Sequence, residues 1–285
     1  MQTLDIFDEY RPKNDILIPD EIKNFIGETS QSTNNKKDYR GLFVVSHSGG
    51  KDSQAMSALI RKYVPDEQIL VIHAHLPGVE WEGTWDHVRN NTVGLESIEV
   101  KAVKTFFDMV KSRGMWPSPS TRQCTSDLKR GPIEKAIRRH LKDNPRFNNN
   151  IINCMGMRAQ ESSARAKRPT LQFSNKNSRA GRTWYDWLPI HDLLIEEVFD
   201  VIKEAGQKPH WAYEKGMTRL SCCFCIMSSH SDLCTAAKLN PKLFAEYVAL
   251  EKEIDFTFMM PSKGKAPKGL EELTGIAVEL ASANI

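Results

Sequence analysis

One short segment of the chain combines the residue types that bind phosphate. Residues 46–53 read Ser-His-Ser-Gly-Gly-Lys-Asp-Ser, between an apolar run and a stretch with helical spacing. Glycines let a backbone approach phosphate oxygens because they carry no Cβ, and the start of a helix offers unpaired N–H donors. A lysine adds a cation, and serine hydroxyls add donors. We therefore predict a phosphate site formed by Ser46, Ser48, Gly49, Gly50, Lys51, Asp52 and Ser53.

The spacing of this segment is not that of the Walker phosphate loop, in which four residues separate the two glycines before the lysine. The alternative to a phosphate site is a tight turn from strand to helix with a capping serine. The glycines, the lysine, the serines and the flanking strand and helix each favour phosphate binding. We therefore favour the phosphate site.

A second segment places two arginines and a glutamate after a predicted strand. Arg158, Glu161 and Arg165 follow the apolar run 151–154, at the end of a strand where open α/β sheets bind ligands. Guanidinium groups bind phosphate bidentately, and Glu161 would orient an arginine or help to hold Mg²⁺. No acidic residue lies between Ser162 and Thr183, a stretch that contains Lys167, Arg168, Lys176, Arg179 and Arg182. We interpret this basic run as a polyanion site; the alternative is a solvated loop.

The cysteines form a third group of interest. Cys222 and Cys225 have C-x-x-C spacing, which lets two thiolates reach one metal from a turn. Cys234, nine residues later, is the best further candidate ligand. The rival interpretations are a tetrahedral zinc, a redox dithiol or plain buried thiols. Cys154 lies inside an apolar run and is expected to be a core residue.

Histidines and tryptophans near these segments are expected to have structural roles. His73 and His75 follow a predicted strand, where histidines are more often hydrogen-bonded structural residues than catalysts. Core packing is likewise the favoured role of Trp81, Trp85, Trp116 and Trp187, although each could flank the site.

Alternating strands and helices must position these residues. Short apolar runs predict strands at 42–45, 69–72, 97–100 and 151–154, and helical spacing predicts helices over 55–63, 85–93, 133–141, 194–205 and 241–254. A short helix is also expected near 19–26, and a polar loop over 174–182. Strand, helix and strand at this spacing form right-handed βαβ units, which predicts an α/β fold with a doubly wound parallel sheet.

Composition divides the chain of 285 residues into three expected parts. Residues 1–40 look like a polar leader, 41–205 like the α/β domain, and 206–285 like a cysteine motif with a helical extension. A hydrophobic content of 40% and a charged content of 26% are typical of a globular protein. No apolar run is long enough for a membrane helix and no secretory signal is seen, so a cytoplasmic protein is expected. In that reducing compartment six cysteines suit metal binding or catalysis better than disulfides.

The loop at 46–53 resembles the S-G-G-x-D-S signature of the PP-loop ATP pyrophosphatase superfamily. Later segments are similar to its phosphoadenosine phosphosulfate (PAPS) reductase branch, near the sulfurtransferases of DNA phosphorothioation. These segments are Arg122-Gln123-Cys124 with Lys129 and Pro132, Gly156 to Ser162 with Arg165, and Leu188-Pro189-Ile190 before Glu196-Glu197-Val198. The resemblance covers about Gly41 to Glu251 and implies an adenine nucleotide α-hydrolase-like fold. It also implies that Lys51, Asp52, Arg158 and Arg165 are catalytic.

The resemblance further implies a [4Fe–4S] cluster on two separated groups of cysteines. Cys124 would belong to one group and the pair Cys222 and Cys225 to the other, with Cys234 as the candidate fourth ligand. Relatives that reduce sulfate esters carry a double cysteine where this chain has Gln123-Cys124, so the identity of the fourth ligand is open. Zinc is the alternative metal.

Three reactions or roles follow from this resemblance. The favoured one is cleavage of ATP, with Mg²⁺, to release pyrophosphate and adenylate an acceptor for sulfur transfer. Its partners would be an adenine nucleotide, a sulfur donor protein and, as an acceptor, a nucleic acid; self-association into a homo-oligomer is also allowed. The second is reduction of a sulfo-nucleotide, which in the family depends on a cysteine in a C-terminal tail, whereas residues 255–285 contain none. The third is a nucleotide-binding subunit of a defence system without turnover.

Overall fold

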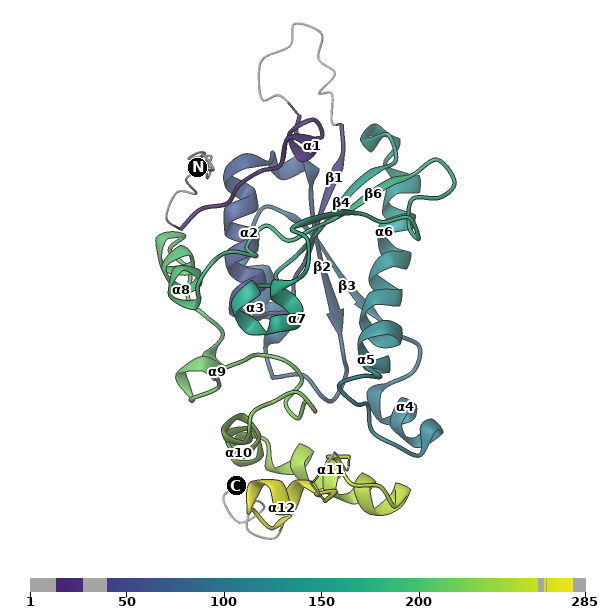
Figure 1. Cartoon of the computed structure of the whole chain (residues 1–285), viewed down its shortest axis with the longest axis vertical. Coiled ribbons are helices and arrows are strands. Elements are labelled where there is room, and N and C mark those ends of the chain that lie inside the picture. The colour runs from purple at the N-terminus through teal and green to yellow at the C-terminus, as the bar shows by residue number, and fades with distance from the viewer. Residues whose placement is uncertain (1–13, 28–39, 261–263, 265, 279–285) are drawn as a thin grey trace, which may run out of the picture.

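A central sheet organises the computed structural model, which describes residues 14–27, 40–260, 264 and 266–278. Its strands are β1 (Leu42–Ser46), β2 (Ile69–His75), β3 (Glu96–Lys101), β4 (Asn150–Met155), β5 (Leu171–Phe173) and β6 (Thr183–Trp187). Their order is β3-β2-β1-β4-β6-β5, and all neighbours are parallel except β5, which pairs antiparallel with β6. The predicted doubly wound parallel sheet is confirmed (Figure 1).

Alternate residues of each central strand face opposite layers of the core. Phe43 and Val45 of β1 pack in one cluster of apolar side chains, while Leu42 and Val44 pack in the other. All four are 1% exposed or less. The sheet is therefore buried on both faces, which is why the strands read as continuous apolar runs in the sequence.

Helices cover both faces of the sheet. On one face lie α2 (Lys51–Tyr63) and α8 (Ile195–Glu204), and on the other α6 (Gly131–Asp143) (Figure 1). Two further helices connect the strands: α3 (Thr84–Asn91) and α4 (Phe106–Arg113). The short helices are α1 (Asp20–Lys23), α5 (Gln123–Thr125), α7 (Ser163–Ala166) and α9 (Trp211–Glu214). A π-helical turn at Ser126–Arg130 joins α5 to α6.

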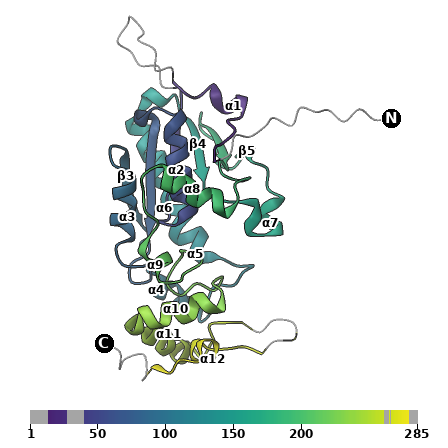
Figure 2. The ribbon, with the colours of Figure 1, turned by 90° about the vertical axis from the view of Figure 1, so that its left-hand side faces the viewer.

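The C-terminal helices pack below the carboxyl ends of the strands. They are α10 (His230–Leu239), α11 (Pro241–Ile254) and α12 (Leu270–Thr274) (Figures 1 and 2). Tyr247 of α11 stacks on Trp116, with ring centroids 5.3 Å apart and an interplanar angle of 9°. The same cluster includes Trp81 and Phe106 from the α/β part. The C-terminal helices therefore share a core with the segments that follow β2 and β3.

The expected polar leader needs a correction. Ile16 and Ile22 are buried against the layer formed by α2 and α8. The side-chain amide of Gln68 donates to the carbonyl oxygens of Phe25 and Gly41 and accepts from the N–H of Gly27. Residues 14–27 therefore belong to the folded core, and residues 1–13 and 28–39 of the expected leader lie outside the described residues.

Most predicted elements are confirmed with shifted ends. The helix predicted over 55–63 begins at Lys51, and the strand predicted over 69–72 continues to His75. Residues 174–182 contain neither helix nor strand, as expected, but the short edge strand β5 before them was not predicted. No helix in the described ranges has the length and apolar character needed to cross a membrane.

Candidate functional site

The phosphate loop lies where β1 ends and the strand order turns. Strand β1 is flanked by β2 on one side and β4 on the other, and the chain leaves β1 directly into α2. This is the topological switch point, where open α/β sheets bind ligands beyond the carboxyl ends of the strands. The segments predicted from the sequence to hold phosphate, 46–53 and 156–165, both begin at this point.

Hydrogen bonds within the loop fix its shape. Gly49 has a φ of +80°, and a Cβ there would lie 2.6 Å from Thr84 Cγ2, so this position requires glycine. The Ser53 hydroxyl accepts from Ser48 N–H at 3.1 Å and donates to the Gly50 carbonyl oxygen at 2.9 Å. Gly49 N–H donates to His47 Nδ1 at 3.0 Å. The loop is thus held in shape by its own side chains, and α2 starts at Lys51.

The Lys51 ammonium is buried beside the segment that precedes the cysteine motif. Lys51 is 4% exposed, and its Nζ donates to the Thr218 carbonyl oxygen at 3.3 Å and lies 3.5 Å from Asp52 Oδ2. Lys51 N–H donates to the Tyr213 hydroxyl at 3.0 Å. Burial is the main cause that raises the pKa of Tyr213 to about 12, so this hydroxyl stays neutral. Sequence reasoning missed Tyr213 because no motif links it to a loop so far away along the chain.

Asp52 and Arg158 meet across the switch point. Arg158 Nε donates to Asp52 Oδ1 at 2.5 Å, and its Nη1 donates to Gln160 Oε1 at 2.6 Å. The Arg158 residue is only 3% exposed. The structure therefore brings together two side chains that the sequence assigned to phosphate binding from separate segments. A buried guanidinium paired with one carboxylate still offers N–H donors to an anion.

Glu161 connects the two predicted arginines. Its carboxylate accepts from Arg158 N–H at 3.0 Å and from the Arg165 guanidinium. Arg165 lies on α7, whose first turn is capped by the Ser162 hydroxyl. Glu161 therefore pairs with the Arg165 side chain and with the backbone of Arg158, and its role in binding an anion or Mg²⁺ stays a prediction.

The basic run after α7 is mostly exposed. Lys167, Arg168, Lys176 and Arg179 are exposed, and Arg182 is half-buried. Lys176 Nζ lies 4.0 Å from Glu134 Oε2. The run thus forms a solvated basic surface beside the arginine segment, and its use as a polyanion site stays a prediction.

Three cysteines act electrostatically on the half-buried Lys129. Burial would lower the pKa of Lys129, but the nearby charges of Cys222, Glu80, Cys225 and Cys124 outweigh it and raise that pKa. Burial raises the pKa of Cys222 to about 12, although Lys129 acts in the opposite direction. Cys124, Cys222 and Cys225 therefore lie close enough to Lys129 for their charges to act on it.

Cys234 lies in a different environment. It sits on α10, where its thiol donates to the Thr274 carbonyl oxygen at 3.5 Å and lies 3.9 Å from the His230 ring nitrogens. Its assignment as fourth ligand finds no support in these contacts and stays a prediction. Cys154 is fully buried in β4, as expected of a core residue.

In the described part of the chain, the cysteine sulfurs do not form a compact site for a single ion. Within the described residues, the sulfurs of Cys124, Cys222 and Cys225 are not all within 4.8 Å of one another. Tetrahedral zinc with bonds of about 2.3 Å would need sulfurs roughly 3.8 Å apart, whereas a cluster of several metal atoms spaces its ligands more widely. The buried Tyr247 hydroxyl has no hydrogen-bond partner among the described residues. Burial and then the charges of these thiols raise its pKa. A polar group left unpaired beside them suits an additional acceptor at that place.

Comparison with known proteins finds similarity over part of the chain. The chain is similar to an uncharacterised protein of Methanocaldococcus jannaschii (23% identity over 74% of this chain and 48% of that protein). It is also similar to an uncharacterised protein of Escherichia phage 186 (29% identity over 52% of this chain and 42% of that protein), so it spans about half the length of these curated relatives. Among solved structures, a PAPS reductase from Candida auris aligns over 67% of this chain and 84% of its own with 15% identity and a TM-score of 0.39.

A match to a family extends over most of the α/β part and the cysteine motif. Residues 42–228 match the phosphoadenosine phosphosulfate reductase domain. This stretch begins with β1, contains the phosphate loop and the arginine segment, and ends after Cys225. The chain with its buried Lys51, its Asp52–Arg158 pair and its cysteine group therefore belongs to the phosphoadenosine phosphosulfate reductase domain family.

Proposed function

We propose that the protein cleaves ATP between its α- and β-phosphates and transfers the adenylyl group to an acceptor that then receives sulfur. The observation that carries this proposal is the meeting of Lys51, Asp52 and Arg158 at the N-terminus of α2. Two buried cations and one carboxylate at a helix start suit a triphosphate with its Mg²⁺. The family match supports an adenine nucleotide as ligand.

Each side chain has a role in this reaction. A nucleophile of the acceptor attacks the α-phosphorus, the bond to the bridging oxygen breaks, and pyrophosphate leaves with the electron pair. Lys51 and Arg158 would stabilise the charge that develops on the leaving group, with Arg165 held near them by Glu161. Asp52 would help to hold Mg²⁺. A sulfur nucleophile then displaces AMP from the adenylated acceptor.

The cysteine group supports the sulfur-transfer half of the proposal. Cys124, Cys222 and Cys225 would hold a [4Fe–4S] cluster, with zinc as the alternative metal. When bound, such a cluster would supply an iron able to bind the sulfur under transfer. The ammonium of Lys129 would balance the negative charge of the thiolates. The same proposal includes a sulfur donor protein in the cytoplasm and a nucleic acid that binds to the basic run as the acceptor. It also includes self-association of the chain into a homo-oligomer.

A reductase is the second candidate. The family is named for the reduction of a sulfo-nucleotide, and the same cations could bind the phosphates of that substrate. A nucleotide-binding subunit without turnover is the third candidate. The two enzymatic candidates differ in the products that leave the nucleotide: pyrophosphate from ATP, or sulfite from a sulfo-nucleotide.

Release of pyrophosphate from ATP by anaerobically purified protein tests the proposal. Lys51→Ala is expected to lower the rate by more than tenfold, which corresponds to about 1.4 kcal/mol of barrier. Lys62→Ala is the matched control because Lys62 is exposed at the other end of the same helix. Asp52 is less suitable, since its removal would leave the buried Arg158 without its carboxylate. Unchanged pyrophosphate release in Lys51→Ala, or sulfite release from PAPS without any pyrophosphate from ATP, would contradict the proposal.

A further inference from the structure

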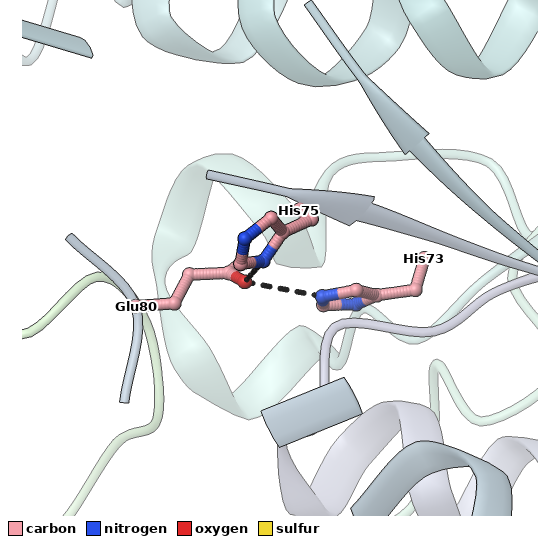
Figure 3. Close-up of side chains that lie close together, drawn as sticks. All are labelled: His73, His75 and Glu80. Atoms are coloured by element: carbon pink, nitrogen blue, oxygen red, sulfur yellow. Dashed lines mark hydrogen bonds and ion pairs between the residues drawn. The ribbon is translucent and has the colours of Figure 1, made fainter. Parts of the chain in front are cut away.

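Two histidines and a glutamate converge beside the phosphate loop. His73 and His75 lie two residues apart on β2 and so project from the same face, and Glu80 lies in the turn that follows (Figure 3). Glu80 Oε2 lies 3.2 Å from His73 Nε2 and 2.7 Å from His75 Nδ1. The three atoms are all within 4.8 Å of one another. The sequence suggested two structural histidines because it gave no sign that Glu80 folds back between them.

The hydrogen bonding of His73 leaves an unshared electron pair aimed at Glu80. His73 Nδ1 lies 2.9 Å from the His47 carbonyl oxygen. A carbonyl oxygen only accepts hydrogen bonds, so Nδ1 carries the proton and Nε2 of the neutral ring is unprotonated. This Nε2 then faces a carboxylate oxygen, another acceptor. A cation between the two atoms resolves the clash, and that cation is either a second proton on His73 or a metal ion.

The surroundings suit a metal ion with one ligand position open. His73 is 1% exposed and its ring stacks on Trp85 at a centroid distance of 5.7 Å, which fixes the direction of Nε2. The side chain of His75 is 26% exposed, so the site opens to solvent on that side. Glu99 Oε1, on β3, lies 4.0 Å from His75 Nδ1 and offers a second carboxylate close by.

We propose that His73 Nε2, His75 Nδ1 and Glu80 Oε2 bind one divalent transition-metal ion, with zinc as the ion that this donor set fits best. Two imidazoles and one carboxylate form a three-ligand zinc set that leaves the fourth position for water or a substrate. With bonds of about 2.0–2.1 Å, tetrahedral zinc separates its ligands by roughly 3.3–3.4 Å. The His73–Glu80 distance of 3.2 Å already matches, and the His75–Glu80 distance of 2.7 Å requires a small opening at a partly exposed side chain.

The ligand set shares no residue with the cysteine group or with the proposed reaction, although Glu80 acts on the same Lys129 as the cysteines and His73 contacts the phosphate loop. The ring of a metal-bound histidine commonly donates its other N–H to a carbonyl oxygen, which orients it. Here that carbonyl belongs to His47 of the loop. A metal at this place would therefore stiffen the chain where β1 leaves the sheet.

Metal binding to the full chain tests the proposal without any measurement of turnover. Protein freed of metal is titrated anaerobically with Co²⁺ and with Zn²⁺ against a chromophoric chelator. Besides any ion at the cysteine group, wild type is expected to bind one ion whose cobalt spectrum shows visible ligand-field bands without thiolate-to-cobalt charge transfer. Cys222→Ser is expected to retain that ion. His75→Ala and Glu80→Gln are each expected to weaken its binding by about tenfold or more.

The matched control is His140→Ala, because His140 is another histidine paired with a carboxylate: its Nδ1 lies 3.4 Å from Glu96 Oε1. It is expected to bind the metal as wild type does. Should His75→Ala fail to fold, His75→Asn keeps a polar side chain of similar size and gives the same readout. Equal affinity in wild type, His75→Ala and Glu80→Gln would overturn the proposal and leave a proton on His73 as the cation. A cobalt spectrum with thiolate charge transfer alone would overturn it as well.

Discussion

Gly156 controls how closely the strand β4 segment approaches the phosphate loop. A Cβ at this position would lie 3.0 Å from three backbone atoms at the start of α2: Asp52 C, Asp52 O and Ser53 N. Backbone atoms cannot rotate away as the end of a side chain can. Gly156→Ala must therefore push the loop after β4 away from α2.

The size of the effect follows from these distances. Ordinary van der Waals contact begins near 3.4 Å, so the two segments must separate by 3.4 − 3.0 = 0.4 Å. Overpacking of this kind costs about 1–3 kcal/mol of folding free energy. The shift falls on the Arg158–Asp52 pair, whose 2.5 Å hydrogen bond spans the same gap. Misplacement of about 1 Å can cost a hundredfold in rate, so a shift of less than half that size is expected to lower turnover by roughly tenfold.

Urea unfolding and ATP titration together measure this prediction. Gly156→Ala is expected to lower the free energy of unfolding by about 1–3 kcal/mol and to weaken ATP binding as well. Gly269→Ala serves as control, since a Cβ there would meet only the Glu251 carboxylate at 3.4 Å or beyond. A Gly156→Ala protein with the stability and ATP affinity of wild type would refute the argument that the close approach of β4 positions Arg158.

Two further predictions concern pH and the cysteines. Burial, followed by the charges of His87 and His73, lowers the pKa of His47 from 6.5 to about 3. Between these two pH values the unfolded chain binds a proton at His47 that the folded chain does not. The free energy of unfolding is therefore expected to fall as pH drops below about 6.5. At pH 5 His47 is expected to lower the free energy of unfolding by about 2 kcal/mol. His47→Asn should therefore flatten the curve of unfolding free energy against pH between about pH 6.5 and 5. An unchanged slope in this variant would contradict the prediction. Cys222→Ser is expected to remove bound iron measured after anaerobic purification, whereas Cys154→Ser should keep the iron and lose stability because it buries a hydroxyl in the core. Full iron content in Cys222→Ser would show that the cysteine group does not hold the metal.

Most of the fold could be predicted from local patterns in the sequence. The strands 42–45 and 151–154 and the helix 241–254 were predictable because each has a continuous apolar run or a clear helical period. The leader was misjudged because Ile16 and Ile22 are two isolated apolar residues among polar ones, and only tertiary packing shows that both are buried. Edge strand β5 escaped notice because its three residues form no recognisable period.

The candidate site was predictable where residues lie within one motif. The loop 46–53 and the segment with Arg158, Glu161 and Arg165 could be read from spacing, and the structure brings them together. Contacts between distant segments could not be read in this way. Tyr213 lies on the short helix α9 and Glu80 in the turn after β2, and neither segment carries a signature, so their contacts with Lys51 and His73 emerged only from the fold.

The contact of Lys51 with Thr218 links nucleotide occupancy to the cysteine segment. Thr218 stands four residues before Cys222, and its N–H and hydroxyl donate to the buried Asp232 of α10 at 2.7 and 2.8 Å. A phosphate that draws the Lys51 ammonium toward itself must compete with the Thr218 carbonyl oxygen, and so alters the free energy of this segment. Coupling free energies are reciprocal, so in the proposed function an occupant of the cysteine group that alters this contact would change the affinity for nucleotide by the same factor. The two halves of the proposed site would then be thermodynamically linked through a single lysine side chain.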